Sequence, residues 1–110
     1  MTFPELLAEI KKVAAKEIRF DMEDSLELVT KADKLKELHS VLERFFGKAA
    51  KPVGQNPTKE ISQLAEEYGG IRSDQTFYYA KKDGLAYYGM LWPWGDRMSV
   101  TVRLFSKKNK

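Results

Sequence analysis

Residues 76–105, TFYYAKKDGLAYYGMLWPWGDRMSVTVRLF, decide the fold that we predict for this chain of 110 residues. Asp83 and Gly84 lie between two runs rich in tyrosine, and they supply the positive φ angles of a two-residue type I′ turn. Residues 94–97 are expected to make a second reversal. The stretch is therefore predicted to form a three-stranded antiparallel meander.

The two turns set which residues face each other, because antiparallel partners keep a constant sum of residue numbers. A turn centred on residues 83–84 places Phe77 opposite Met90. The second turn is predicted to place Trp92 opposite Ser99. This register also decides which side chains share a face of the sheet, since successive residues of a strand point to opposite faces.

Both faces of the predicted meander are apolar, whereas a sheet with one face in water would alternate apolar and polar residues. The second apolar face therefore needs helices, a partner or a ligand to cover it. One face carries an aliphatic stripe, which we assign to the helices, formed by Met98, Val100, Val102 and Leu104. The pattern leaves open the opposite assignment, and also helices that cover part of each face.

The other face is aromatic and holds one guanidinium, and it is the predicted partner-binding surface. Aromatic residues and Arg are enriched where proteins bind each other, and the aromatic residues on this face outnumber its cations. The predicted partner-binding residues are Phe77, Tyr79, Tyr88, Trp92, Trp94 and Arg103. We therefore expect a non-enzymatic recognition module that binds a protein partner or associates with itself, with nucleic acid as the alternative partner.

A first helix is predicted to begin at about Pro4. Thr2 and Glu5 have the spacing of a capping box, and apolar residues recur at helical spacing after them. Residues 18–30 come next and alternate apolar with charged side chains, which is typical of a short hairpin. An early start of the second helix fits this segment equally well, and both alternatives stay open.

Two further helices are predicted before the meander. Thr30 and Asp33 form another capping pair, and the apolar stripe that follows them ends at Gly47. Pro57 begins a third helix, which stops at the two glycines of residues 69–70. The expected fold class is therefore α+β, with three helices followed by a three-stranded antiparallel β-meander and the helices packed on one sheet face.

Length and composition predict a single α+β domain of residues 1–106 and a disordered basic tail of residues 107–110. The chain has no cysteine and one histidine, His39, which excludes thiolate catalysis, cysteine-ligated metals and multi-histidine metal sites. No catalytic residue, metal site or cofactor is predicted. A small enzyme or ligand-binding domain with an unrecognised pocket is the third choice, because residues far apart in sequence meet in space.

Charge and hydropathy bound the partners and the compartment. The net charge is +3, and residues 47–110 hold 11 basic and 6 acidic side chains, so this part of the chain is where an anionic partner would bind. No apolar run approaches the roughly 18 residues that a membrane span requires. We therefore expect no membrane partner, and the lack of cysteine fits a cytoplasmic protein.

Residues 64–73, LAEEYGGIRS, resemble a helix-turn-helix motif, because Ala65 precedes the turn residue Gly69 by four and an aliphatic residue follows. The resemblance to winged-helix proteins implies DNA binding, with residues 73–82 as the helix that enters the groove. It also implies that residues 85–105 form a two-stranded wing. A winged-helix-like DNA-binding protein is therefore the alternative to a module that recognises a protein.

Overall fold

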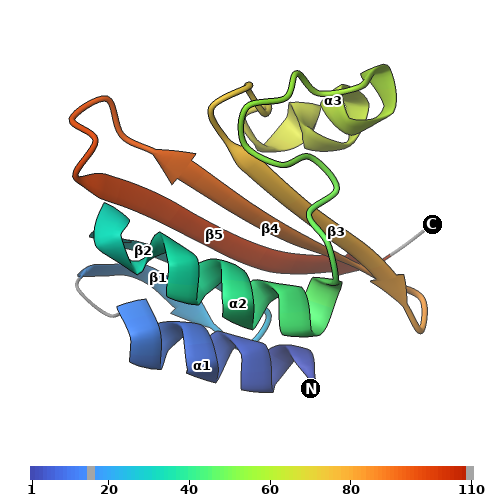
Figure 1. Cartoon of the computed structure of the whole chain (residues 1–110). Helices are drawn as coiled ribbons and strands as arrows, with labels where there is room; N and C mark the ends of the chain where they lie inside the picture. The colour runs from blue at the N-terminus through green and yellow to red at the C-terminus, as the bar shows by residue number, and fades with distance from the viewer. Residues whose placement is uncertain (15–16, 109–110) are drawn as a thin grey trace.

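The computed structural model describes residues 1–14 and 17–108, and its main element is a five-stranded antiparallel sheet (Figure 1). The strands are β1 (Glu17–Met22), β2 (Ser25–Lys31), β3 (Thr76–Lys82), β4 (Leu85–Pro93) and β5 (Ser99–Lys108). Their order across the sheet is β1-β2-β5-β4-β3. The helices are α1 (Phe3–Ala14), α2 (Leu35–Phe46) and α3 (Lys59–Ala65), with 3₁₀ turns η1 (Ala32–Lys34) and η2 (Glu66–Tyr68).

The predicted fold class is wrong in its strand count and in its order of elements. Two additional strands, β1 and β2, lie between α1 and α2, so the helices do not all precede the strands. The hairpin alternative for residues 18–30 is the one that forms, with Met22 opposite Ser25. Leu28 of β2 lies opposite Val102 of β5, and this pairing turns the predicted meander into part of a larger sheet.

The helix starts follow the predicted capping signals in one case and depart from them in another. The capping box of α1 is confirmed: Thr2 N donates to Glu5 Oε1 at 3.0 Å, and Glu5 N donates to Thr2 Oγ1 at 3.2 Å. The capping role predicted for Thr30 is wrong, because Thr30 is buried in β2 opposite Val100 and α2 begins only at Leu35. Strand pairing with β5 therefore outweighs the local capping signal.

The third helix begins slightly later than predicted. Thr58 is its N-cap, and its hydroxyl oxygen accepts a hydrogen bond from Ile61 N at 3.3 Å. The chain then passes through η2 to Gly69, whose φ of 99° lies in the left-handed region that glycine adopts without strain. This glycine ends the helical segment, as predicted.

The register of the β3–β4 hairpin is confirmed, whereas that of the β4–β5 hairpin differs. Phe77 lies opposite Met90 as predicted, but Trp92 lies opposite Thr101 instead of Ser99. The second reversal is longer than expected: Trp94 N donates to Ser99 O at 2.9 Å across it. Because the register shifts by an even number of residues, the side chains within β4 and β5 stay on their predicted faces.

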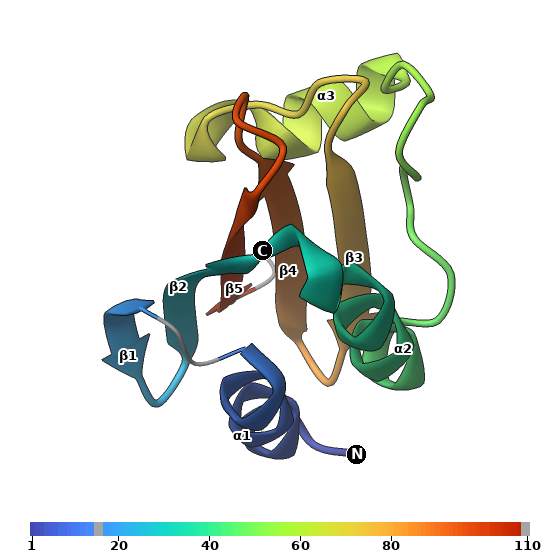
Figure 2. The same ribbon diagram turned by 60° about the vertical axis from the view of Figure 1, so that its left-hand side comes forward.

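The two faces of the sheet have separate cores. Figures 1 and 2 show α1 and α2 side by side on one face, which we call the helix face. Val100, Val102 and Leu104 are fully buried there, as predicted, whereas Met98 lies outside β5 and is 71% exposed. On the opposite face, the aromatic face, α3 packs against a second core. The prediction that all helices lie on one face is therefore wrong, because both faces carry apolar residues that need cover.

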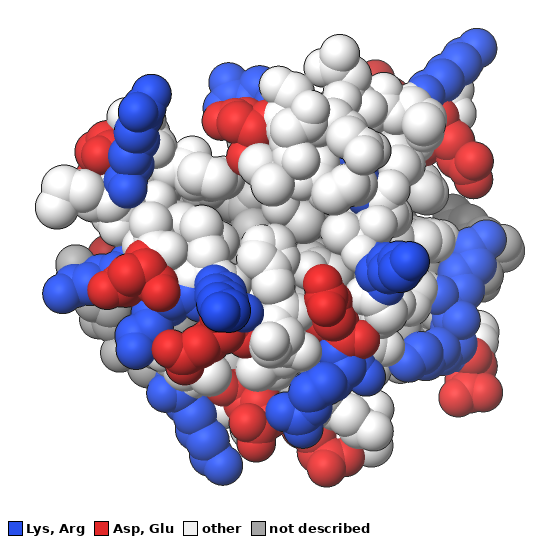
Figure 3. Space-filling view, viewed as in Figure 1, with Lys and Arg blue, Asp and Glu red and all other residues white. Residues whose placement is uncertain are grey.

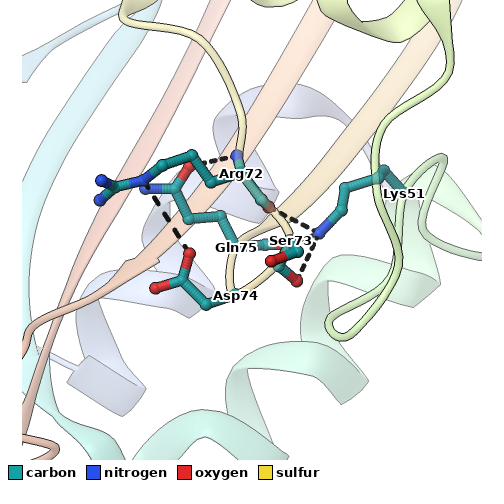
Figure 4. Close-up of polar contacts among 5 residues, drawn as sticks. All are labelled: Lys51, Arg72, Ser73, Asp74 and Gln75. Carbon is teal, nitrogen blue, oxygen red and sulfur yellow. Dashed lines mark hydrogen bonds and ion pairs between the residues drawn. The ribbon is translucent and has the colours of Figure 1, made fainter.

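The edge of the sheet at β3 is closed by a buried lysine. Lys51, 2% exposed, exchanges backbone hydrogen bonds with Phe77 at 3.0 and 3.1 Å. Its ammonium group points into the turn before β3 (Figure 4), where it donates to the carbonyl oxygens of Arg72 at 2.8 Å, of Ser73 at 2.9 Å and of Gln75. Carbonyl oxygens therefore replace the water that this buried charge has lost.

The last described residues continue the sheet. β5 extends to Lys108, and Lys107 lies opposite Ala86 of β4. Two residues of the predicted disordered tail are thus in a strand. Residues 109–110 lie outside the described part of the chain.

Candidate functional site

The aromatic face is built from rows of neighbouring residues that cross all five strands. Its middle row runs, in order, through Phe77, Met90, Arg103, Glu27 and Phe20. The row begins at fully buried Phe77 and ends at Phe20, which is 48% exposed. The face therefore changes from an apolar interior at β3 to an exposed surface at β1.

The half of the aromatic face on β3 and β4 is covered by the chain itself. The ring of Tyr68, from η2, lies 5.2 Å from that of Tyr88 and 4.6 Å from that of Phe105. Phe77 and Tyr88 are buried beneath this cover, and Tyr79 is half-buried beside them. Burial, reinforced by Tyr68 and Tyr79, raises the pKa of Tyr88 to about 12. These three predicted binding residues therefore contribute to the second core.

The other predicted binding residues lie at the edge of this cover and beyond it, with Trp92 packed against the second core next to Gly69. Trp94 is 39% exposed, and Trp92 and Arg103 are half-buried. Trp94 Nε1 donates a hydrogen bond to Thr101 Oγ1 at 2.9 Å, which holds the indole against β5. Trp92 Nε1 is buried and has no hydrogen-bond partner among the described residues. The two tryptophans thus lie next to one hollow, whose volume is about 730 Å³.

Residues of β1 and β2 complete this surface, although sequence analysis did not assign them to it. The guanidinium of Arg19 lies 5.7 Å above the Trp94 ring, close enough for a cation–π contact. Arg19 and Phe20 also line a groove of about 330 Å³ together with Glu27 and Arg103. The alternation within residues 18–30 was the available signal. This alternation indicated a hairpin, but it did not indicate that β2 of the hairpin pairs with β5.

We call the uncovered surface the open patch. It consists of Arg19, Phe20, Glu27, Trp92, Trp94 and Arg103. Its two most exposed apolar side chains are Phe20 and Trp94, which come from an edge strand and a hairpin loop respectively.

Four basic residues in and around the open patch have acidic neighbours. The ion pairs are Arg19–Glu17 at 3.9 Å, Arg103–Glu27 at 4.0 Å, Arg72–Asp74 at 4.0 Å and Lys107–Glu67 at 3.7 Å. Pairs this long and this exposed are worth little stability, but they cancel most of the local positive charge. On the helix side of the molecule, basic and acidic side chains are likewise interspersed (Figure 3).

The single histidine lies on the helix face, away from the open patch. His39 Nδ1 and the hydroxyl oxygen of Tyr78 are 2.7 Å apart. Burial raises the pKa of Tyr78 to about 12 and lowers the pKa of His39, with Glu43 opposing the latter shift. The pair therefore joins α2 to β3 through a neutral hydrogen bond.

The DNA-binding alternative loses its main structural element. Residues 76–82, which the winged-helix resemblance places in a groove-entering helix, form β3. Arg72 and Asp74 lie exposed in the turn that precedes this strand. In this turn, the buried ammonium group of Lys51 donates hydrogen bonds to the backbone carbonyl oxygens.

No protein-family profile, no curated protein and no solved structure matches the chain. Among the described residues, no helix is long and apolar enough to cross a membrane, and no three His, Asp or Glu residues are grouped to hold a metal ion. The proposed function therefore rests on the open patch.

Proposed function

We propose that the chain is a non-enzymatic recognition domain that binds an extended segment of a protein partner on the open patch. The observation that carries this proposal is the partial cover of the aromatic face. α3 and η2 bury Phe77 and Tyr88, while Phe20 and Trp94 remain 48% and 39% exposed on the uncovered half. Exposed aromatic side chains grouped with arginine are typical of residues that dominate protein interfaces.

The charge distribution supports a protein partner over nucleic acid. A nucleic-acid site needs an excess of cations to displace the counterions of the phosphate backbone. In the open patch, Arg19 lies 3.9 Å from Glu17 and Arg103 lies 4.0 Å from Glu27. A partner segment with mixed apolar and polar side chains matches this balance better than a polyanion.

An extended partner is supported by the position of β1. The edge at β3 is occupied by Lys51, whereas β1 is the other edge and all six of its residues are exposed. A segment lying beside β1 would gain main-chain hydrogen bonds from the strand and side-chain contacts from Phe20. The bulge between Ile18 and Phe20 interrupts regular pairing, which favours a short segment.

The proposal is tested with a displayed library of random peptides selected against the wild-type domain. We expect the selected peptides to lose at least about tenfold in affinity, a difference of about 1.4 kcal/mol, when Phe20→Ser or Trp94→Ala is introduced. The matched control is Val53→Ser, because Val53 is 61% exposed but lies in the loop between α2 and α3. The control should bind the same peptides with unchanged affinity.

Two results would contradict the proposal. One is a library that enriches no peptide on the wild-type domain, combined with a single monomeric species in sedimentation equilibrium. The other is a set of selected peptides whose affinity changes by the same factor for the patch variants and for Val53→Ser. A wild-type dimer that Phe20→Ser and Trp94→Ala dissociate would instead identify the partner as a second copy of the chain.

A further inference from the structure

The groove between β1 and β5 has the size and composition of a small recognition site. Its volume is about 330 Å³, and its lining includes Arg19, Phe20, Glu27, Arg103 and Phe105. Volumes of this order hold small ligands or single side chains of a partner. Two guanidinium groups and one carboxylate line the same groove, and the carboxylate of Glu17, which is not part of the lining, lies 3.9 Å from Arg19.

Arg103 lies in this groove with most of its hydrogen-bonding capacity unused. Its guanidinium has five N–H donors, and its hydrogen bond among the described residues is that of Nη1 to Tyr68 O at 3.4 Å. The carboxylate of Glu27 is 4.0 Å from Nε, beyond hydrogen-bond distance. The guanidinium also lies 5.1 Å from the centre of the Phe105 ring, which limits its orientation. Arg103 is thus held in place while donors remain available.

Arg19 supplies a second guanidinium from the opposite wall of the groove. Its contacts are an ion pair of 3.9 Å with Glu17 and a cation–π contact of 5.7 Å with Trp94. Neither contact engages the N–H groups in a short, well-aligned hydrogen bond. Its side chain is 42% exposed, so it can turn towards a ligand at little cost.

We propose that the groove is a subsite for a carboxylate carried by the partner segment, held between Arg103 and Arg19 and flanked by Phe20. Guanidinium groups bind carboxylates through paired, charge-assisted hydrogen bonds, which is the geometry that the unused donors of Arg103 offer. The aromatic walls match an apolar group next to the carboxylate. This inference rests on the proposed function for its ligand source, a protein segment, but its chemistry is testable without one.

The first experiment uses 3-phenylpropanoate as a probe and 3-phenylpropanamide as its neutral isostere. Both are titrated into the full chain while backbone amide shifts are followed by NMR. We expect the carboxylate to shift the amides around Arg19, Glu27 and Arg103, and the neutral amide to bind at least about fivefold more weakly. Added salt should weaken the binding of 3-phenylpropanoate and leave the affinity for the neutral amide unchanged.

Substitutions in the groove separate charge recognition from simple apolar packing. Arg19→Gln should lower the affinity for 3-phenylpropanoate at least about threefold. Arg103→Lys should also lower this affinity, because lysine lacks the paired N–H donors with which a guanidinium group binds both oxygens of a carboxylate. Glu27→Gln should strengthen binding, because it removes the carboxylate that competes for Arg103. Arg44→Gln on α2 is the matched control, since Arg44 is exposed on the other side of the molecule, and it should change nothing.

Several outcomes would overturn the inference. Equal affinity for the acid and the amide, or a Glu27→Gln variant that binds no more tightly, shows that the groove does not recognise a carboxylate. If peptides bind the open patch but glutamate-containing peptides gain nothing over their glutamine counterparts, the proposed function stands and the subsite fails. If 3-phenylpropanoate binds while no peptide does, the subsite stands and its source is a free carboxylic acid.

Discussion

At the residue scale, the burial of His39 beside Tyr78 makes folding sensitive to pH. Burial lowers the pKa of His39 below its ordinary value, so the unfolded chain binds more protons than the folded chain when the pH falls below about 6.5. The free energy of unfolding should therefore fall as the pH is lowered from 7 to 5. Because His39 is the only histidine, this change can be assigned to one group.

The measurement is urea unfolding of the wild type and of His39→Asn across this pH range. At pH 7 the variant should be less stable by about 0.5–1.5 kcal/mol, because the buried hydroxyl of Tyr78 loses its partner. At pH 5 the difference should shrink, because the wild type has lost stability through protonation of His39. Parallel pH profiles for the two proteins would show that the imidazole does not titrate as inferred.

Lys51 gives the second prediction at this scale. Its ammonium group satisfies three carbonyl oxygens of the turn before β3, and these would face an apolar side chain in Lys51→Met. We expect a loss of about 1.5–3 kcal/mol in the free energy of unfolding, measured by urea denaturation. Lys48→Met, an exposed lysine in the same loop, is the control and should stay within about 0.5 kcal/mol of the wild type.

A result in which Lys51→Met and Lys48→Met are equally stable would contradict the role of Lys51. It would mean that the carbonyl oxygens of Arg72 and Ser73 find water in its absence. Burial lowers the pKa of Lys51 while the carboxylate of Asp74 opposes this shift. The charge is thus costly to bury, and the hydrogen bonds to the turn offset that cost.

At the element scale, α3 and η2 divide the aromatic face into a structural half and an open half. Tyr88 packs against Tyr68, Phe105 and Tyr79, so Tyr88→Ala should cost about 3–5 kcal/mol. Phe20→Ser on the exposed edge strand should cost less than about 1 kcal/mol. Thermal unfolding of both variants measures the difference. Equal losses would show that the boundary between the two halves is drawn in the wrong place.

The bulge in β1 affects both the edge of the sheet and the open patch. The register of β1 against β2 shifts between Ile18 and Phe20, so Arg19 has no regular partner on β2. A bulged edge strand pairs poorly with long strands of other molecules, which limits aggregation. At the bulge, Arg19 lies above Trp94. The same irregularity therefore limits strand pairing at the edge and contributes Arg19 to the open patch.

At the scale of the whole molecule, the charge distribution sets the expected response to nucleic acid. The net charge is +3, and four basic residues in and around the open patch each lie within 4.0 Å of a carboxylate: Arg19, Arg72, Arg103 and Lys107. We expect no detectable binding to random duplex DNA at about 50 mM salt in a fluorescence anisotropy titration. Binding that weakens steeply as salt rises would contradict this expectation and support the DNA-binding alternative.

Local patterns predicted those parts of the fold that depend on neighbouring residues. The capping box of Thr2 and Glu5 and the hairpin at residues 83–84 both formed where their signals lie. The longer β4–β5 reversal was missed because Asp96 Oδ1 accepts hydrogen bonds from Met98 N and Ser99 N, a side-chain contact that a turn count ignores. The faces were still correct, since an even register shift preserves them.

The candidate site was predictable only in part. Trp92 and Arg103 were assigned to the aromatic face because strand alternation can be counted from a turn, and Trp94 was assigned to the loop that follows β4. The same count could not show that Tyr68 would cover Tyr88, because this contact joins η2 to the middle of the sheet. Nor could it place Phe20, since β1 reaches the patch only through the pairing of β2 with β5.

By itself, the sequence determined which side chains of residues 76–105 share a face, because backbone alternation and turn chemistry act over a few residues. The tertiary structure alone decided which part of the aromatic face stays uncovered and which residues surround it. Pairings such as Leu28 with Val102 join segments far apart in the chain. Their stability comes from apolar area buried by the whole assembly of elements, and no local pattern encodes that area.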